Sequence, residues 1–437
     1  MFFFKSLFIL FLIISYYFSV YNILLYFYLL YNYLGGDVME RIILHIDCNN
    51  AFLSWTAVHM LHSGSNIDIR NKYAVIGGKE SERRGIVLAK SNLCKKKGVV
   101  TGETLYSARK KCPYLLVFNP EFKIYKKYSD MMYTFLSGYT KKIERYSIDE
   151  CFLDYTDLVE KYGEPIQLAY KIRDDIRNNF GFTVNVGIGN NKLLAKMASD
   201  FSKPNKVHTL FHEEISSKMW PLPVSDLFMI GKASSKKLIS LGIKTIGELA
   251  HTDLDYLVNH FKSMGKMMWE YANGIDESEV ETDYGNPKSI SNSIVLPYNY
   301  TNTEEIKSVL RDLSSSVGYR LRKKKMFAQN VSILVKFDDF TTINKQTMLD
   351  NPINSDSEIL DNAFSLFNSI WNTDSDKKIR SLGVGVSNLS TIYKVQLSIF
   401  KNDNINLKKD EEIENIIKNI NNKFGDKVIS FADKIEK

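Results

Sequence analysis

The sequence predicts an α+β protein built from several domains. Its 437 residues are enough for two to four domains of ordinary size, each with a buried core. Short apolar runs typical of strands alternate with longer segments of helical periodicity. The composition, 44% hydrophobic and 24% charged, excludes a wholly disordered chain and the usual composition of a polytopic membrane protein.

The first 38 residues differ from the rest of the chain. Residues 6–34 are almost all Phe, Leu, Ile and Tyr, and this run exceeds the roughly 20 apolar residues that cross a bilayer. A membrane anchor and a signal peptide are both open interpretations, although the run is too long for an ordinary signal sequence. We favour a third, that translation starts at Met39, because everything after it is typical of a cytosolic protein.

The four cysteines are spaced without a CxxC pair. They are Cys48, Cys94, Cys112 and Cys151. Such spacing favours neither a zinc site nor a disulfide framework. We therefore expect reduced thiols and a cytoplasmic protein.

Secondary structure can be assigned in order along the rest of the chain. The first elements expected are strands at 41–46, 146–154 and 182–188 and a helix at 190–202. Asp47 closes the first strand, and Pro204 stops the helix. The elements expected later are two short helices between 224 and 250, a linker at 285–293, strands at 331–337 and 382–386, and helices at 304–323 and 358–371.

A basic, loop-rich stretch occupies residues 79–111. It holds ten Lys or Arg against three Glu, a surplus of seven that equals the net charge of the whole chain, +7. A run of this kind is often only a solvated face. Here the charges are interleaved with turns and short apolar runs, which equally favours a surface that contacts phosphates.

Three carboxylates stand beside apolar runs. Asp47 ends the first strand, and Asp149 and Glu150 lie within a second apolar region. A carboxylate so placed is costly unless it is paired or binds a cation. Three converging carboxylates could hold two Mg²⁺ ions for phosphoryl transfer, whereas separate surface or salt-bridged acids are the alternative. Adjacent residues of a regular strand face opposite sides, so Asp149 and Glu150 share a side only near a turn.

The helix expected at 190–202 carries a stripe of lysines. Lys192, Lys196 and Lys203 fall on one side at 3.6 residues per turn. The opposite side is apolar and consists of Leu193, Leu194, Met197 and Phe201. The lysine side is either a cradle for phosphates near a metal site or a solvated face.

Together these motifs resemble those of the Y-family DNA polymerases, and most closely the bacterial DNA polymerase IV and UmuC-like group. The motifs are Asp47-Cys48-Asn49-Asn50-Ala51-Phe52, Ser147-Ile148-Asp149-Glu150, and Gly187-Ile188-Gly189 through Lys203-Pro204-Asn205. The resemblance extends from about Met39 to Phe400. It implies a right-hand polymerase with palm, fingers, helical thumb and an α+β little finger.

The resemblance also implies roles for single residues. Asp47 and Asp149 match metal-binding aspartates, and Glu150 matches the catalytic glutamate. The backbone carbonyl of Cys48 matches a contact to the second of two Mg²⁺ ions. Phe52 matches the steric gate that excludes a ribose 2′-hydroxyl, although a core aromatic role is also open.

The triphosphate and thumb positions depart in part from the family pattern. Lys203 matches a triphosphate-contacting lysine, whereas Asn92 and Lys95 stand where the family often has Tyr and Arg. A lysine supplies charge without a bidentate fork. Met229 replaces the first glycine of the thumb turn, and the expected DNA contacts there are Gly231 and Lys232.

The implied domains divide the chain after the leader into four parts. They are palm and fingers at 39–210, thumb with a helix-hairpin-helix-like element at 211–284, little finger at 285–395, and a clamp-binding motif with a helical tail at 396–437. In the little finger Arg322 and Lys323 are expected to contact the DNA backbone. The residues Gln396, Leu397, Ile399 and Phe400 resemble the bacterial sliding-clamp peptide, with a buried edge strand as the alternative.

The implied activity is error-prone translesion synthesis. Partners would be primer-template DNA, deoxynucleoside triphosphates, the sliding clamp and, in UmuC-like proteins, accessory subunits. A membrane partner follows only if residues 1–38 are retained. The competing class is a non-catalytic relative that binds DNA or the clamp.

Overall fold

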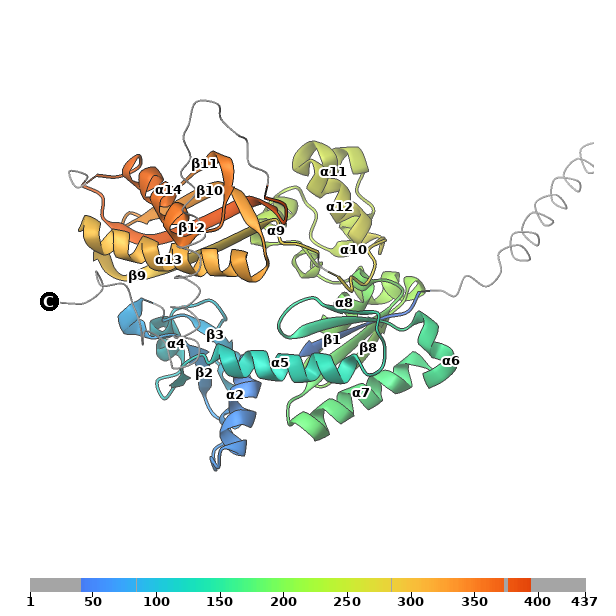
Figure 1. Ribbon diagram of the computed structural model, residues 1–437. Helices are drawn as coiled ribbons and strands as arrows, with labels where there is room; N and C mark the ends of the chain where they lie inside the picture. The colour runs from blue at the N-terminus through green and yellow to red at the C-terminus, as the bar shows by residue number, and fades with distance from the viewer. Residues whose placement is uncertain (1–40, 84, 284, 373–375, 394–437) are drawn as a thin grey trace, which may run out of the picture. The chain divides into compact units, whose positions relative to one another are not determined.

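The computed structural model describes residues 41–83, 85–283, 285–372 and 376–393. The leader at 1–38, the clamp-like motif at 396–400 and the tail that follows it lie outside the described residues. Contacts between Cα atoms divide the chain into two compact units (Figure 1). The first unit contains residues up to 68 and 121–283, and the second contains residues 69–120 and everything from 284 onward.

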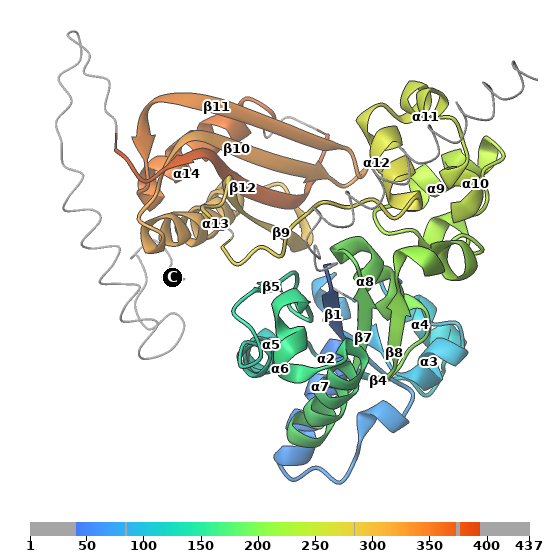
Figure 2. The same cartoon turned by 90° about the vertical axis from the view of Figure 1, so that its right-hand side faces the viewer.

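A five-stranded sheet forms the centre of the first unit. Its strand order is β5 (Ile143–Arg145), β6 (Glu150–Asp154), β1 (Ile43–Cys48), β7 (Val184–Gly189) and β8 (Val207–Leu210). β1 pairs antiparallel with both β6 and β7, and all six of its residues are buried. β1, β7 and β8 lie next to one another in Figure 2. The strands predicted at 41–46 and 182–188 are thus confirmed.

The strand predicted at 146–154 is instead the second half of a hairpin. β5 ends at Arg145 and β6 begins at Glu150, with a bend over residues 147–149 between them. The backbone N–H of Ser147 donates to the carbonyl of Glu150 (3.2 Å) and closes this bend. The bend takes Asp149 out of the regular strand.

Helices cover both faces of this sheet. Those in contact with it or with one another are α2 (Ala51–His62), α5 (Phe122–Leu136), α7 (Pro165–Phe180) and α8 (Lys192–Asp200), and the short α6 (Val159–Tyr162) precedes α7. In Figure 1 α7 and α8 lie on opposite sides of the sheet. α8 is capped by the Asn191 side chain, which accepts from the Leu194 N–H at 2.9 Å.

The close approach of α8 to β7 depends on two glycines. A Cβ atom at Gly187 would lie 1.9 Å from the Ala195 carbonyl oxygen, and one at Gly189 would lie 2.7 Å from the Ala195 nitrogen. Real Cβ atoms do not approach backbone atoms so closely. The helix can therefore lie against the strand only because both positions are glycine.

The rest of the first unit is helical. Its α-helices are α9 (Lys232–Ser240), α10 (Ile246–Ala250), α11 (Leu254–Phe261) and α12 (Ser263–Ala272). They share one apolar core with the buried side of α8, which includes Leu194, Met197, Leu238 and Met268. The two short helices predicted between 224 and 250 correspond to α9 and α10, and the apolar face predicted for the 190–202 helix is confirmed.

The second unit contains two separate sheets. The smaller has the order β3 (Val87–Lys90), β2 (Ala74–Gly77), β4 (Leu116–Phe118) and carries the helices α3 (Asn92–Lys96) and α4 (Leu105–Lys111). The larger has the order β11 (Thr342–Ile353), β10 (Phe327–Phe337), β12 (Ile379–Ser390), β9 (Ser289–Tyr300). Because β9 begins at Ser289, the predicted linker at 285–293 is shorter than expected.

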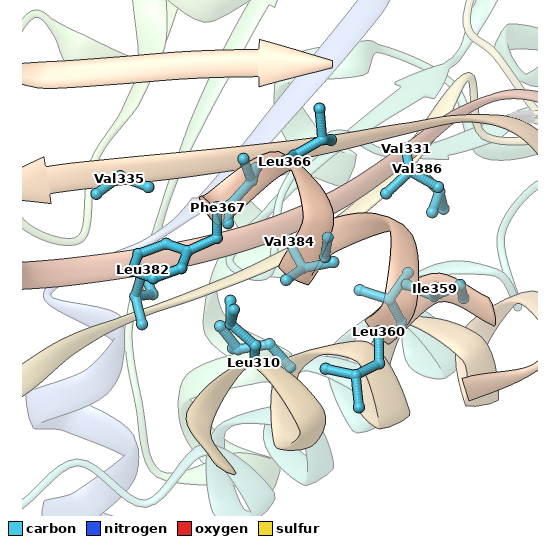
Figure 3. Close-up of a cluster of buried hydrophobic side chains, with 14 of the residues drawn as sticks. Leu310, Val331, Val335, Ile359, Leu360, Leu366, Phe367, Leu382, Val384 and Val386 are labelled. Carbon is cyan, nitrogen blue, oxygen red and sulfur yellow. The ribbon is translucent and has the colours of Figure 1, made fainter. Parts of the chain in front are cut away.

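Two helices complete the larger sheet's core. α13 (Thr303–Lys323) and α14 (Asp356–Asn368) match the helices predicted at 304–323 and 358–371. Figure 3 shows Leu310 of α13 and Phe367 of α14 among Leu382 and Val384 of β12. Within the described ranges, no helix is both long and apolar enough to cross a bilayer.

The substitution Gly187→Ala should destabilise the first unit by at least about 3 kcal/mol, because the new methyl group collides with the backbone of α8. The midpoint of thermal unfolding, followed by circular dichroism, measures the effect. Gly231→Ala is the control, since its added Cβ meets no atom within 4 Å. Equal stability of the two variants would contradict the packing argument.

Candidate active site

The pairing of β1 with β6 brings the three predicted carboxylates together. Asp47 and Glu150 are directly opposite each other in the strand register. The carbonyl of Asp149 accepts from the backbone N–H of Cys48 at 3.0 Å. Residues about a hundred positions apart in the chain are therefore neighbours at one end of the sheet.

Asp149 and Glu150 direct their carboxylates to the same side. The hydroxyl of Ser147 lies 2.7 Å from Asp149 Oδ1 and 3.4 Å from Glu150 Oε2. One hydroxyl can reach both only because Asp149 belongs to the bend before β6 and escapes the alternation of a regular strand. The turn required for convergence is present.

Asp47 has an unusual electrostatic environment. The residue is only 6% exposed. Burial raises the pKa of its carboxyl from 3.8 to about 6; Lys203 opposes this shift, and the nearby carboxylates of Glu150 and Asp149 add to it. A cation bound at this position would offset the free-energy cost of burying the charged carboxylate. It would also reduce the repulsion between the acids.

The lysines of α8 and its extension each contact a carboxylate. Lys203 pairs with Asp47 and, at 2.8 Å, with Asp200. Lys196 pairs with Glu150 at 2.6 Å. Although burial opposes it, the two carboxylates around Lys203 hold the pKa of this ammonium above its usual range.

Lys192 completes the set by pairing with Glu144 at 2.7 Å. The predicted stripe is thus not a solvated face, because each of its three lysines is paired with a carboxylate. The lysines form ion pairs with carboxylates of the sheet, because α8 lies close to β7 and β1.

The donor set fits a hard divalent cation. Three carboxylates lie at neighbouring backbone positions, and oxygen is the ligand type that Mg²⁺ prefers. The Cys48 thiol is buried, with its pKa well above the usual value because of burial, which leaves the backbone carbonyl as the group it could offer. In this structure the three carboxylates are paired with lysines and with Ser147. Among the described residues, no group of three or more His, Cys, Asp or Glu side chains is arranged so that it could hold a metal ion.

Phe52 lies in the first turn of α2, within an aromatic cluster. Its ring stacks on Tyr125 with centroids 4.4 Å apart and planes 9° apart, and Phe122 meets it edge-on at 5.9 Å. The residue is half-buried. Its ring packs in the core and also keeps an exposed part, so the core and gate roles are compatible.

Two asparagines, Asn49 and Asn185, hold the segment that carries Lys203, a role that was not predicted from the sequence. Asn185 in β7 donates to the carbonyls of Ser199 (2.9 Å) and Ser202 (2.6 Å). Asn49 donates to Asn185 at 3.2 Å and accepts from the Asn205 N–H at 2.8 Å. Asparagines within an apolar strand and directly after one were the available signal, since a buried amide needs partners.

Comparisons with known proteins decide the family. Residues 46–200 match the model of the impB/mucB/samB family, and residues 287–399 match the model of its C-terminal domain. The chain is 46% identical over 399 residues to a DNA polymerase IV of Clostridium acetobutylicum, covering 91% of this chain and 99% of that protein. The chain belongs to the impB/mucB/samB family, the Y-family DNA polymerases.

Other relatives agree with this assignment. DNA polymerase IV 2 of Bacillus subtilis is 35% identical over 398 residues, covering 89% of this chain and 93% of that protein. A solved Y-family DNA polymerase chimera, Dbh-Dpo4(243-245)-Dbh, has the same fold, with a TM-score of 0.68, 23% identity and coverage of 81% of this chain and all of that one. The predicted resemblance is confirmed, and Y-family polymerases are metal-dependent enzymes.

The thumb turn of this Y-family chain differs from the expected glycine turn. Met229 itself adopts the left-handed conformation, with φ of 70°, and the residue is 53% exposed. Gly231 has an ordinary φ of −79° and stands at the N-terminus of α9, where Lys232 is exposed. A methionine therefore occupies the strained position for which glycine is suited.

The basic residues predicted in the second unit have different environments. Lys95, in α3, and Lys323, at the end of α13, are exposed. Arg322 is not: its side chain is 7% exposed, and its Nη1 donates to Asp356 at 2.9 Å and to the Asn354 carbonyl at 2.8 Å. These contacts tie α13 to α14 and leave Arg322 unsuited to the DNA contact expected from the sequence.

The pH dependence of stability should reveal the buried Asp47. Folded Asp47 keeps its proton up to about pH 6, whereas the ordinary value is 3.8. Protonation therefore favours the folded state, and in metal-free protein this contribution, about 3 kcal/mol, is lost as pH rises from about 4 to about 6. Urea unfolding with a chelator between pH 4 and 8 measures it.

The variant Asp47→Asn should lack this component, so its stability relative to wild type should increase with pH. Asp154→Asn, which alters a carboxylate at the far end of β6, is the control and should keep the component that comes from Asp47. Parallel curves for Asp47→Asn and wild type would contradict the assignment.

Proposed function

We propose that this protein is a template-directed DNA polymerase of the translesion type, which adds deoxynucleotides to a primer 3′ end. The observation that carries the proposal is the convergence of Asp47, Asp149 and Glu150 where β1 meets β6. Membership of the Y family supports the same reaction. A non-catalytic relative is not favoured, because all three acids are present.

Two Mg²⁺ ions are the metals proposed for this site. Asp47, Asp149, Glu150 and the backbone carbonyl of Cys48 would hold them. When bound, such ions lower the pKa of the primer 3′-hydroxyl and neutralise charge on the triphosphate. The protein itself contributes a desolvated carboxylate at Asp47 and a fixed separation between the acids, since Asp47 and Glu150 pair across one sheet and Asp149 is hydrogen-bonded to Cys48 directly before β6.

Lys203 is the proposed contact to the incoming triphosphate. Its ammonium lies against Asp47 and is about one-third exposed, so it borders the metal site and can reach a ligand. The Asn49–Asn185 pair would hold the segment that carries it. Lys95 would add charge without a bidentate fork.

Phe52 is the proposed steric gate. A rigid ring held by Tyr125 cannot move aside at low cost, because the stacking and its burial would be lost. A ribose 2′-hydroxyl would have to displace it.

Contacts to DNA and partners follow from exposure and charge. The backbone at Gly231, together with Lys232 and Lys323, would contact phosphates, and such binding would weaken with salt. We extend the proposal to the motif Gln396, Leu397, Ile399 and Phe400 as an anchor for the bacterial sliding clamp. The cytoplasm, where chromosomal DNA is copied, would be its location.

Primer extension should depend on the acids of the bend and β6. Asp149→Asn and Glu150→Gln keep the side-chain size and should each lower kcat/KM at least about 10³-fold, because the charge that faces the reaction is removed. Asp154→Asn, in the same strand, should remain within about threefold of wild type. Extension by the Asp149→Asn/Glu150→Gln double variant at wild-type rates would overturn the mechanism.

The variant Phe52→Ala should incorporate ribonucleotides at least about tenfold better relative to deoxynucleotides, because the excluding ring is gone. Single-nucleotide kcat/KM values with matched ribo- and deoxyribonucleotides give the ratio. Phe122→Ala removes a ring from the same cluster and should leave the ratio unchanged. A Phe52→Ala ratio equal to wild type would leave the ring with a packing role only.

A further inference from the structure

Lys196 is the most enclosed lysine of the site. It lies in the middle of α8, and its side chain is 11% exposed. Its Nζ donates to Glu150 Oε1 at 2.6 Å, and the Glu150 side chain is 17% exposed. Lys203, by contrast, is 34% exposed and shared between Asp47 and Asp200.

Aromatic rings restrict the position of the Lys196 ammonium. Its Nζ lies 5.6 Å from the ring centroid of Tyr146 and 5.5 Å from that of Phe228. The two rings are themselves in contact, with centroids 6.2 Å apart. Ring faces attract a cation, so the two rings help to hold the ammonium in place.

Phe228 is in turn fixed to the helical part of the first unit. Its ring stacks on Tyr271 at 6.3 Å with planes 10° apart, and its N–H donates to Met197 Sδ at 3.4 Å. Lys196 therefore has little freedom to leave Glu150 for a phosphate.

The two oxygens of Glu150 consequently have different surroundings. Oε1 accepts from Lys196, and Oε2 lies toward Ser147, whose hydroxyl also reaches Asp149. The lysine thus fixes the rotation of the carboxylate and leaves Oε2 on the side of Asp149. That is the side on which the proposed metal ions would lie.

We infer that Lys196 is a positioning residue that orients Glu150, rather than a contact to the triphosphate. The inference rests on the proposed function. Partners that orient a metal-binding carboxylate are typically worth 10- to 100-fold in activity or affinity.

Lys196→Met removes the charge and keeps most of the length of the side chain. We expect kcat at saturating nucleotide to fall about 10- to 100-fold, with the KM for nucleotide within about threefold of wild type. Mn²⁺ binding to the DNA-free protein, measured by electron paramagnetic resonance, should be as tight as in wild type or tighter, since a competing cation is gone. Lys196→Arg, which keeps the charge, should recover kcat to within about tenfold.

Lys192→Met is the matched control. Lys192 lies one turn earlier on α8, and its pair with Glu144 is similarly buried, with exposures of 12% and 5%. The Lys192→Met variant should lose as much thermal stability as Lys196→Met does, but it should retain the wild-type kcat.

Three results would overturn the inference. A KM that rises tenfold at unchanged kcat would make Lys196 a triphosphate contact. Loss of Mn²⁺ binding together with activity, or equal losses in both variants, would make it structural. A Lys196→Met enzyme as active as wild type would end this inference alone, whereas a wild-type protein that extends no primer would end the proposed function.

Discussion

The site depends on a buried negative charge at the end of a buried strand. β1 is covered on both faces, and Asp47 is its penultimate residue, so this carboxylate has little water around it. An isolated charge in that position would be too costly. Lys203 forms an ion pair with Asp47 and so compensates part of this cost. A metal ion bound at the same position would compensate it in the same way. The cost of the buried negative charge therefore explains why the lysine ammonium groups lie beside these carboxylates.

The second requirement is a helix close enough to supply those cations. Gly187 and Gly189 let α8 lie against β7, and only at that distance do Lys196 and Lys203 reach the acids. The buried amide of Asn185 then fixes the end of the helix by donating hydrogen bonds to the carbonyls of Ser199 and Ser202. The ion pairs therefore depend on the close packing of the α8 backbone against β7. If α8 moved away from β7, the lysines would no longer reach the acids.

The larger sheet of the second unit differs in that it is stabilised by an apolar core, with basic residues at the end of α13. This sheet and its two helices bury a continuous set of aliphatic and aromatic side chains. Arg322 joins α13 to α14 from within, while Lys323, one residue later, faces solvent. Adjacent basic residues thus have opposite uses, and only the outer one is suited to a phosphate backbone.

Much of this protein was determined by the sequence itself: the strand that carries Asp47 near its end, the glycine-containing strand before α8, the α+β second half and the identity of the three acids. Those follow from local periodicity and from residue types, which are properties of short segments. The tertiary structure alone decided that residues 147–149 form a bend, that Lys196 belongs to Glu150, that Met229 takes the left-handed position and that Arg322 is buried. Each of these depends on which distant segments come together, and a stripe of lysines looks the same in sequence whether it faces water or a row of carboxylates.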